Sequence, residues 1–144
     1  MDTRRWALSG GNAELGREIF QTIGDCQRCH GGGGGHGGGV GPSLAGVRAK
    51  GAEHVLESVL EPNAKIANGF ASIVVRRRDG SSTSGLIVNE DASSLVLDIG
   101  APYPVTIALD DIVERSAPIS GMPPVGLGLA PQALRDVVAY VMTL

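Results

Sequence analysis

The chain has 144 residues, a length that suits one domain, or one domain with an insertion, and that permits a buried core without disulfides. Its formal net charge of -3 is spread over both signs, so nucleic acid is not an expected partner. The apolar runs are shorter than the roughly 18 to 20 residues that span a bilayer, and no transmembrane segment is expected. Only 3% of the residues are aromatic, so a large flat cofactor would supply apolar bulk that the core otherwise lacks.

Residues 1–11 are expected to form an N-terminal arm or linker. Met1 to Leu15 contain Arg4 and Arg5, but no apolar stretch of about 7 to 15 residues follows them. The segment therefore does not have the pattern of a secretory signal peptide.

Three segments carry apolar residues at helical spacing and are predicted as helices. The first begins at Asn12, a residue type that favours the N-cap, and ends at Gly24. The second covers Ala52 to Glu61 and the third covers Pro131 to Met142. Their expected apolar faces are Leu15, Ile19, Phe20 and Ile23, then Val55, Leu56, Val59 and Leu60, then Leu134, Val137, Val138 and Val141.

The periodicity changes from helical to extended between the second and third helices. Short runs rich in Val, Ile and Leu predict strands at Phe70 to Arg78, Thr83 to Asn89, Ser94 to Ile99, Tyr103 to Leu109 and Ile112 to Arg115. Asp79-Gly80 and residues 90–93 suit the turns between strands. The expected fold class is α+β, mainly α, with one domain over residues 12–144 and an antiparallel β insertion at residues 70–115.

The motif Cys26-Gln27-Arg28-Cys29-His30 carries the chemistry of the chain. In Cys-x-x-Cys-His, the two thiols can add to the vinyl groups of haem, and the histidine is placed as an axial ligand of the iron. Two alternatives use the same residues. A zinc site would recruit Cys26, Cys29, His30 and His36, but it would lack the usual spacer between ligand pairs. A redox dithiol or structural disulfide would leave His30 unexplained.

The residues after the motif include a possible second partner for the histidine ring. Residues 31–41 are nearly all glycine and are expected to form a loop, which leads into Gly41-Pro42-Ser43-Leu44. The carbonyl of Pro42 could accept the second ring N–H of His30 and fix the imidazole's orientation. The alternative is that Pro42 only stiffens the exit of the loop.

Four side chains are candidates for the sixth ligand of the iron. Met122 lies in Ser120-Gly121-Met122-Pro123-Pro124, where two prolines and a glycine can hold one side chain rigidly. Met142 falls in the last turn of an apolar helix, where packing explains it. His36 is surrounded by glycines, and His54 lies beside an apolar stripe, so both favour surface positions. Met122 is therefore the expected ligand, because methionine with histidine is the usual pair in electron-transfer cytochromes c.

These features together resemble class I cytochrome c. The resemblance rests on Gly16-x-x-x-Phe20, the Cys26-x-x-Cys29-His30 motif, Gly41-Pro42-Ser43-Leu44, Met122-Pro123 and a last helix with Tyr140. It implies haem c attached at Cys26 and Cys29, with iron bound by His30 and Met122 and with Pro42 bonded to His30. It also implies that the first and last helices cross at Gly16, Phe20 and Tyr140.

More specifically, the chain resembles the Pirellula/Verrucomicrobium-type haem-binding domain. The matching stretches are residues 56–63, Asp79-Gly80 with residues 85–88, and residues 109–114. The resemblance implies a domain of a large exported bacterial protein, often after a dehydrogenase-like propeller. The expected location is periplasmic or otherwise exported, and the chain is expected to be a piece of a longer exported protein.

The expected function is electron transfer rather than catalysis, with a redox partner protein or a fused dehydrogenase domain as the donor. One alternative is a haem enzyme or gas-sensing domain whose sixth iron position is open. Another is a haem-free metal-binding or interaction module. The strand order of the β insertion loosely resembles small SH3-like or Sm-like barrels, which does not indicate its purpose.

Overall fold

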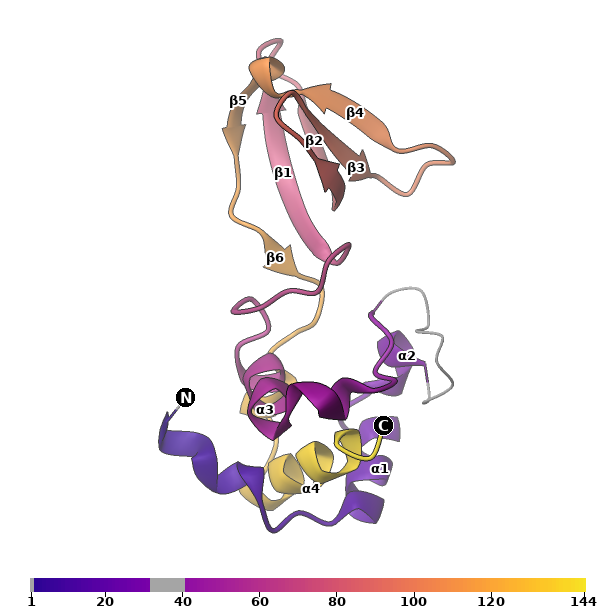
Figure 1. Cartoon of the computed structure of the whole chain (residues 1–144), viewed down its shortest axis with the longest axis vertical. Helices are drawn as coiled ribbons and strands as arrows, with labels where there is room; N and C mark the ends of the chain where they lie inside the picture. Colours follow the sequence, from indigo (N-terminus) through magenta and orange to yellow (C-terminus); the bar gives the residue numbers. More distant parts are fainter. Residues whose placement is uncertain (1, 32–40) are drawn as a thin grey trace. The chain divides into compact units, whose positions relative to one another are not determined.

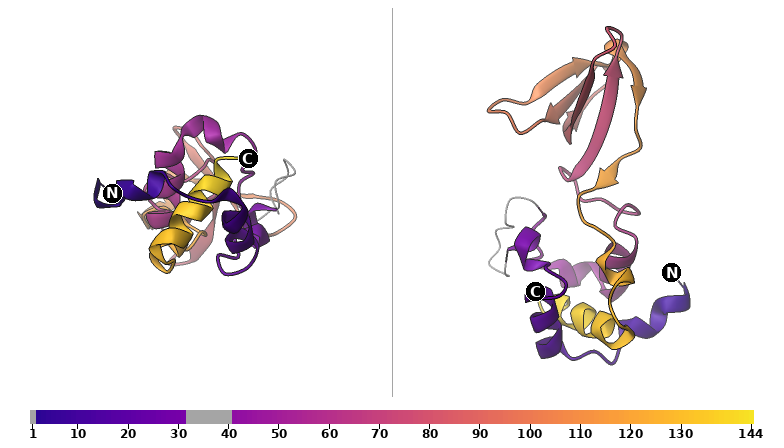
Figure 2. Two further views of the ribbon diagram at one scale, coloured as in Figure 1. Left: turned by 90° about the horizontal axis from the view of Figure 1, so that it is seen from below. Right: turned by 180° about the vertical axis from the view of Figure 1, so that it is seen from behind.

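The computed structural model describes residues 2–31 and 41–144 (Figures 1 and 2). The chain divides into two compact units. Residues 1–65 and 122–144 form a helical unit, and residues 66–121, from Ile66 to Gly121, form a sheet unit.

The helical unit contains four α-helices and three short 3-10 helices within the described residues. They are η1 (Asp2–Leu8), α1 (Ala13–Gln21), α2 (Gln27–His30), η2 (Val47–Lys50), α3 (Ala52–Leu60), η4 (Val125–Leu127) and α4 (Pro131–Val141). Helices α1, α3 and α4 lie at the three predicted positions. Helix α1 is shorter than predicted, because the chain turns after Gln21 rather than at Gly24.

Helices α1 and α4 come from opposite ends of the chain and cross in close contact (Figure 2). A Cβ placed on Gly16 would lie 1.9 Å from the Asp136 carbonyl oxygen, so no larger residue fits at this crossing. Beside it, the rings of Phe20 and Tyr140 meet edge to face with centroids 5.2 Å apart. The crossing expected at Gly16, Phe20 and Tyr140 is confirmed. Gly11 makes a second close approach, 2.1 Å from its Cβ position to the Arg135 carbonyl oxygen.

Polar contacts fix the start of α1 against α4. The side chain of Asn12 caps α1 by accepting hydrogen bonds from the backbone N–H groups of Glu14 and Leu15, at 2.9 and 3.1 Å. The backbone N–H of Asn12 in turn donates to the carboxylate of Asp136, at 2.7 Å. Asp136 is only 3% exposed, and Gln132 donates to the same carboxylate oxygen at 2.9 Å. The buried charge is therefore hydrogen-bonded, as buried carboxylates require.

The core of the helical unit draws residues from both ends of the chain. Its buried members are Ala7, Phe20, Val55, Leu56, Val59, Leu60, Leu134, Val138 and Val141. Two expectations are corrected here. Residues 2–8 form η1 rather than a plain arm, and Ala7 is 1% exposed within the core. Leu15 and Ile23, expected on the buried face of the first helix, are 48% and 81% exposed.

The sheet unit is a six-stranded antiparallel sheet. Its elements are β1 (Ala71–Arg77), β2 (Ser82–Glu90), β3 (Ser94–Asp98), β4 (Val105–Ala108), η3 (Leu109–Asp111), β5 (Ile112–Arg115) and β6 (Ile119–Ser120). The strand order is β4-β3-β2-β1-β5, and β6 also pairs with β1. Alternate side chains point to one face of each strand, which places Ile73, Val75, Leu95, Leu97 and Ile107 in a second core.

Two details of the sheet differ from the expected strands. The fourth strand begins at Val105, so Tyr103 and Pro104 belong to the preceding loop, and Tyr103 is 82% exposed. Strand β6 extends the sheet beyond residue 115, through the pairs Ala71 with Ser120 and Ser72 with Ile119.

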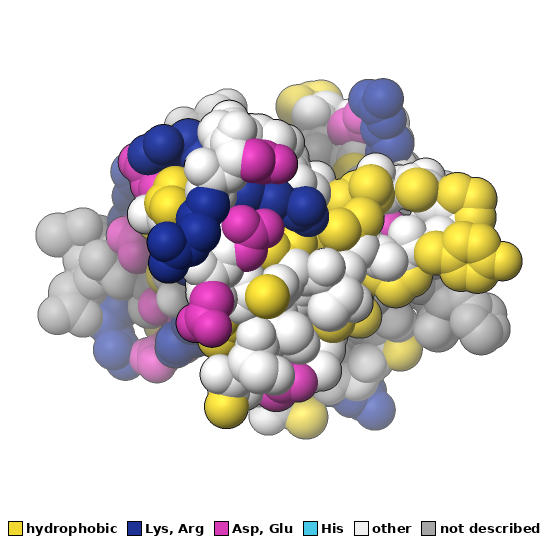
Figure 3. All heavy atoms as spheres, turned by 90° about the horizontal axis from the view of Figure 1, so that it is seen from above, with side chains coloured by type: hydrophobic (Ala, Val, Ile, Leu, Met, Phe, Trp, Pro, Cys, Tyr) yellow, Lys and Arg dark blue, Asp and Glu magenta, His cyan; other side chains and the backbone are white. Residues whose placement is uncertain are grey.

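Figure 3 shows that exposed apolar side chains gather on one part of the visible surface and charged ones on another.

An ion pair joins two strands that are not neighbours in the sheet. The guanidinium of Arg115 on β5 donates to both carboxylate oxygens of Glu90 on β2, at 2.7 and 3.2 Å. This arrangement lowers the pKa of Glu90, mainly through the hydrogen bond from Arg115. In the strand order, β1 lies between these two strands.

Candidate haem-binding site

The motif cysteines and histidine lie on one short helical turn. Cys26 is the N-cap of α2, and Cys29 and His30 are its last two residues. The backbone N–H of His30 donates to the carbonyl of Cys26 at 2.9 Å, so these two residues lie on the same face of the turn. Both cysteines are free thiols, and both are half-buried. The turn thus presents two sulfurs and one imidazole from adjacent positions.

The Cys26 thiol is held against the core of the helical unit. Its Sγ lies 3.6 Å from the carbonyl oxygen of Gly24, and a Cβ on Gly24 would lie 3.1 Å from that sulfur. Burial raises the pKa of the Cys26 thiol, and the nearby Asp25 and Cys29 raise it further against an opposing backbone hydrogen bond. The group is therefore a neutral thiol near pH 7.

The imidazole of His30 is fixed by the chain that returns after the glycine-rich segment. Its Nδ1 lies 2.7 Å from the carbonyl oxygen of Pro42, which has no proton to give, so Nδ1 is the donor. This contact confirms the expected pairing of Pro42 with His30. It assigns the proton to Nδ1 and leaves the lone pair of Nε2 for a metal.

Gly41 is a supporting residue whose role the sequence analysis did not identify. Its backbone N–H donates to the carbonyl of Cys29 at 3.1 Å. A Cβ there would lie 3.1 Å from that carbonyl oxygen and 3.2 Å from Cε1 of His30. Glycine at this position lets the returning chain lie against the motif, so that the neighbouring Pro42 carbonyl reaches the ring. The sequence signal was the glycine immediately before Pro42.

The candidates for the sixth ligand lie in different places. Met122 and Met142 are half-buried, and both pack against the core of the helical unit. His54 lies on α3, and its pKa is lowered by burial, with added repulsion from Lys50 and Lys65. His36 lies outside the described residues. The structure therefore brings Cys26, Cys29, His30 and Pro42 together directly, and it places Met122 in the same unit.

The residues around α2 fit a covalently attached haem. Two unpaired thiols, an oriented imidazole and a neighbouring apolar core are the groups that such a cofactor requires. Within residues 2–31 and 41–144, no group of three or more His, Cys, Asp or Glu side chains is arranged to hold a metal ion by itself. None of the helices in that part of the chain is long and apolar enough to cross a membrane.

Comparison with known proteins agrees with this site. Residues 11–72 match the protein family described as cytochrome C oxidase, cbb3-type, subunit III. A search of curated proteins finds none that matches the chain. The matched segment contains Cys26, Cys29, His30 and Pro42, and the cofactor of cytochrome c domains is haem c with its iron. The chain therefore carries a segment similar to a cytochrome c haem-binding domain, a class that serves electron transfer.

Proposed function

We propose that the chain is a single-haem electron-transfer domain with histidine and methionine as the axial ligands. In this proposal Cys26 and Cys29 would hold the haem covalently, and Nε2 of His30 and the thioether of Met122 would bind its iron. The observation that carries the proposal is the 2.7 Å contact between His30 Nδ1 and the Pro42 carbonyl. That contact orients the imidazole for ligation, and an isolated surface histidine would have no need of it.

The chain's own residues have three tasks in this mechanism. When bound, the haem iron supplies one-electron oxidation and reduction. The Pro42 carbonyl keeps the proton on Nδ1 and makes the ring of His30 a stronger donor. The apolar core that packs against Cys26 keeps water from one side of the site, and a thioether from Met122 favours the reduced state. With His30 and Met122 both bound to it, the iron would have no free position for a substrate, so the domain would relay electrons without catalysis.

A more specific family assignment rests on the resemblance in residues 56–63 and 109–114. We assign the chain to the Pirellula/Verrucomicrobium-type haem-binding domains, in an exported bacterial protein. The electron donor is then a dehydrogenase, fused or separate. Export also agrees with covalent haem attachment, which belongs to exported cytochromes c.

Axial ligation is tested in holoprotein matured together with the haem-attachment machinery. The unmodified protein is expected to be low-spin in the ferrous state and not to bind carbon monoxide. Met122→Ala is expected to become high-spin and to bind carbon monoxide promptly. Met142→Ala is the matched control, because it removes the other methionine that packs on the same core, and it is expected to keep the low-spin spectrum.

Two results would overturn parts of the proposal. Prompt binding of carbon monoxide by the unmodified protein would favour a haem enzyme or a gas sensor with an open sixth position. Absence of covalent haem after acid-acetone extraction of fully matured protein would end the cytochrome assignment. In that case a haem-free metal-binding or interaction module would be the remaining candidate.

A further inference from the structure

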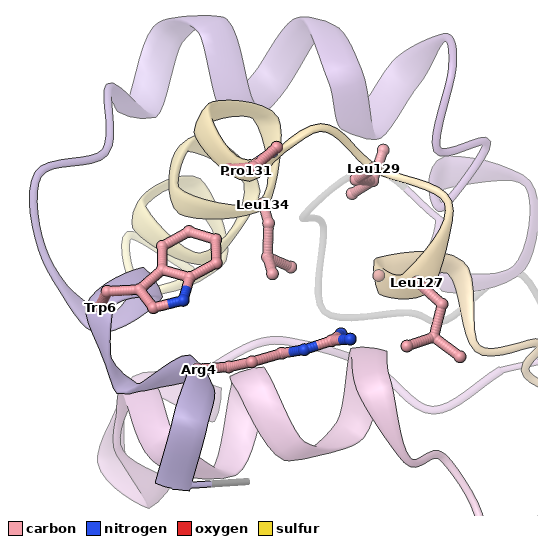
Figure 4. Close-up of a pocket in the computed structure, with 7 residues that line it drawn as sticks. Arg4, Trp6, Leu127, Leu129, Pro131 and Leu134 are labelled. Atoms are coloured by element: carbon pink, nitrogen blue, oxygen red, sulfur yellow. The ribbon is translucent and has the colours of Figure 1, made fainter.

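The helical unit contains a cavity that shares no lining residue with the site around α2. It has a volume of about 190 Å³ and lies among η1, η4 and the start of α4 (Figure 4). Polar and apolar surface contribute about equally to its walls, and one cationic side chain reaches across it (Figure 4). The residues that matter here are Arg4, Trp6, Leu127, Leu129, Pro131 and Leu134.

The aromatic side of the cavity, Trp6, is held in place by contacts within the chain. The guanidinium of Arg135 lies 5.1 Å from the centroid of the Trp6 ring, and its Nε donates to the Trp6 carbonyl at 3.2 Å. Leu134 is 3% exposed at the base of the cavity, as part of the core. At the mouth, Trp6 and Leu127 are still 38% and 59% exposed, so apolar surface there stays in contact with water. A ligand with an apolar body would remove that surface from water.

The positive charge at the cavity is the guanidinium of Arg4. Its neighbour Arg5 pairs with Glu53 at 2.9 Å, whereas no carboxylate among the side chains that the structure describes, which exclude those of Asp2 and Thr3, pairs with Arg4. In Figure 4 the Arg4 side chain extends across the opening toward Leu127. A planar guanidinium in this position suits a carboxylate, which can accept two parallel hydrogen bonds from it.

We propose that this cavity binds a small carboxylate with an aromatic or branched aliphatic body, about the size of benzoate. The body lies against Trp6, Leu127 and Leu134, and the carboxylate pairs with Arg4. The size limit follows from the volume, which is below the roughly 300 to 1,000 Å³ of pockets for larger ligands. The binding is independent of the haem, because the lining residues do not include the motif or Met122.

Trp6 is the only tryptophan of the chain, so its indole N–H resonance reports on this cavity alone. The experiment titrates reduced, diamagnetic holoprotein labelled with ¹⁵N and follows that resonance at constant ionic strength. Benzoate is expected to shift it saturably, with a Kd in the millimolar range typical of so few ligand atoms. Benzyl alcohol lacks the charge and acetate lacks the body, so each is expected to bind at least about tenfold more weakly.

The variant Arg4→Gln is expected to weaken benzoate binding about tenfold or more, because it removes the charged hydrogen-bond donor. Arg5→Gln is the matched control, since it neutralises the adjacent arginine outside the cavity and is expected to leave the Kd unchanged. A benzoate shift that stays linear would overturn the proposal, as would equal affinity for benzyl alcohol or an unchanged Kd in Arg4→Gln. The ligand series in the unmodified protein decides the question even if the variant fails to fold.

Discussion

The two units of the chain build their interiors by different means. The sheet unit buries five aliphatic side chains from β1, β3 and β4, and its strands satisfy one another's backbone groups. The helical unit makes more use of glycines that let backbones touch, at Gly11, Gly16, Gly41 and Gly126, whereas the described part of the sheet unit has one such contact, between Gly85 and the Asp98 backbone. Helix α2, which carries the motif, has no buried residue of its own. We infer that the helical unit is completed by its cofactor, whereas the sheet unit is complete in itself.

Removal of the haem is expected to have the largest effect and to separate the two units. In the double variant Cys26→Ser and Cys29→Ser, the helical unit loses the cofactor that fills its interior. We expect resonances of Leu134 and Val138 to broaden and lose dispersion, while those of Ile73 and Leu95 keep theirs. Heteronuclear NMR on the labelled protein measures both sets. Equally sharp and dispersed signals from the two units would show that the helical unit needs no haem.

The glycine contact between α1 and α4 gives the next largest effect. Gly16→Val places carbon atoms where the Asp136 carbonyl oxygen lies, 1.9 Å from the Cβ position, and must push the helices apart. We expect a loss of about 3 kcal/mol or more in the free energy of unfolding, measured by urea titration of the holoprotein. Gly128→Ala is the control, because Gly128 has an ordinary helical backbone and its Cβ would lie 3.7 Å from the nearest atom. That variant is expected to change stability by less than about 0.5 kcal/mol. Similar losses in both variants would disprove the role of close packing at Gly16.

A smaller effect is expected in the sheet unit from the bidentate pair of Glu90 and Arg115. Glu90→Gln removes the charge from a pair whose side chains are 38% and 36% exposed. Exposed pairs contribute little, so the expected loss is at most about 1 kcal/mol, seen in the unfolding of the sheet unit. Glu114→Gln breaks the pair with Arg76, which is more exposed and has one acceptor oxygen, and should cost less. The haem spectrum is expected to stay the same in both, and a change in it would show that the units are energetically coupled.

The smallest effect concerns His54 of the helical unit. Its pKa is lowered on folding, first by burial and then by Lys50 and Lys65, so the unfolded chain takes up the proton more readily. The neutral ring thus favours the folded state above the ordinary pKa of about 6.5, and this advantage is lost as the pH falls below that value. His54→Asn is expected to reduce the drop in urea midpoint between pH 7.5 and 5.5. An identical drop in the variant and the unmodified protein would contradict this.

Several features could be predicted because they depend on local pattern. Alternation of apolar and polar residues encodes the face of a strand, so the strands that bury Ile73, Leu95 and Ile107 were located from sequence. The contact between the His30 ring and the Pro42 carbonyl, and the crossing of α1 and α4 at Gly16, were predicted from motifs. The residue spacing of each motif corresponds to a single geometry. The ligand role of Met122 stays a prediction, since its packing against the core is shared with Met142.

Other features depend on tertiary contacts and leave little trace in the sequence. The burial of Ala7 arises from contact with a distant helix, and no periodic pattern in residues 2–8 indicates it. The roles of Gly11 and Gly41 are set by backbone atoms that approach from elsewhere in the chain. Helical spacing in α1 predicted that Leu15 and Ile23 lie on the buried face. The spacing shows which residues share the apolar face of the helix, but not which part of that face another element covers. Strand β6, with two residues, is too short for alternation to show.

The pairing of β6 with β1 has a consequence for how such a chain can arise. Because Ala71 and Ser120 are antiparallel register partners, the polypeptide enters and leaves the sheet at points about 5 Å apart. Closely spaced ends of this kind favour insertion of a unit into a loop of another protein. The sheet can therefore be gained, lost or exchanged as a single cassette, and Ala71 and Ser120 mark where a designer could cut it out or put another in its place.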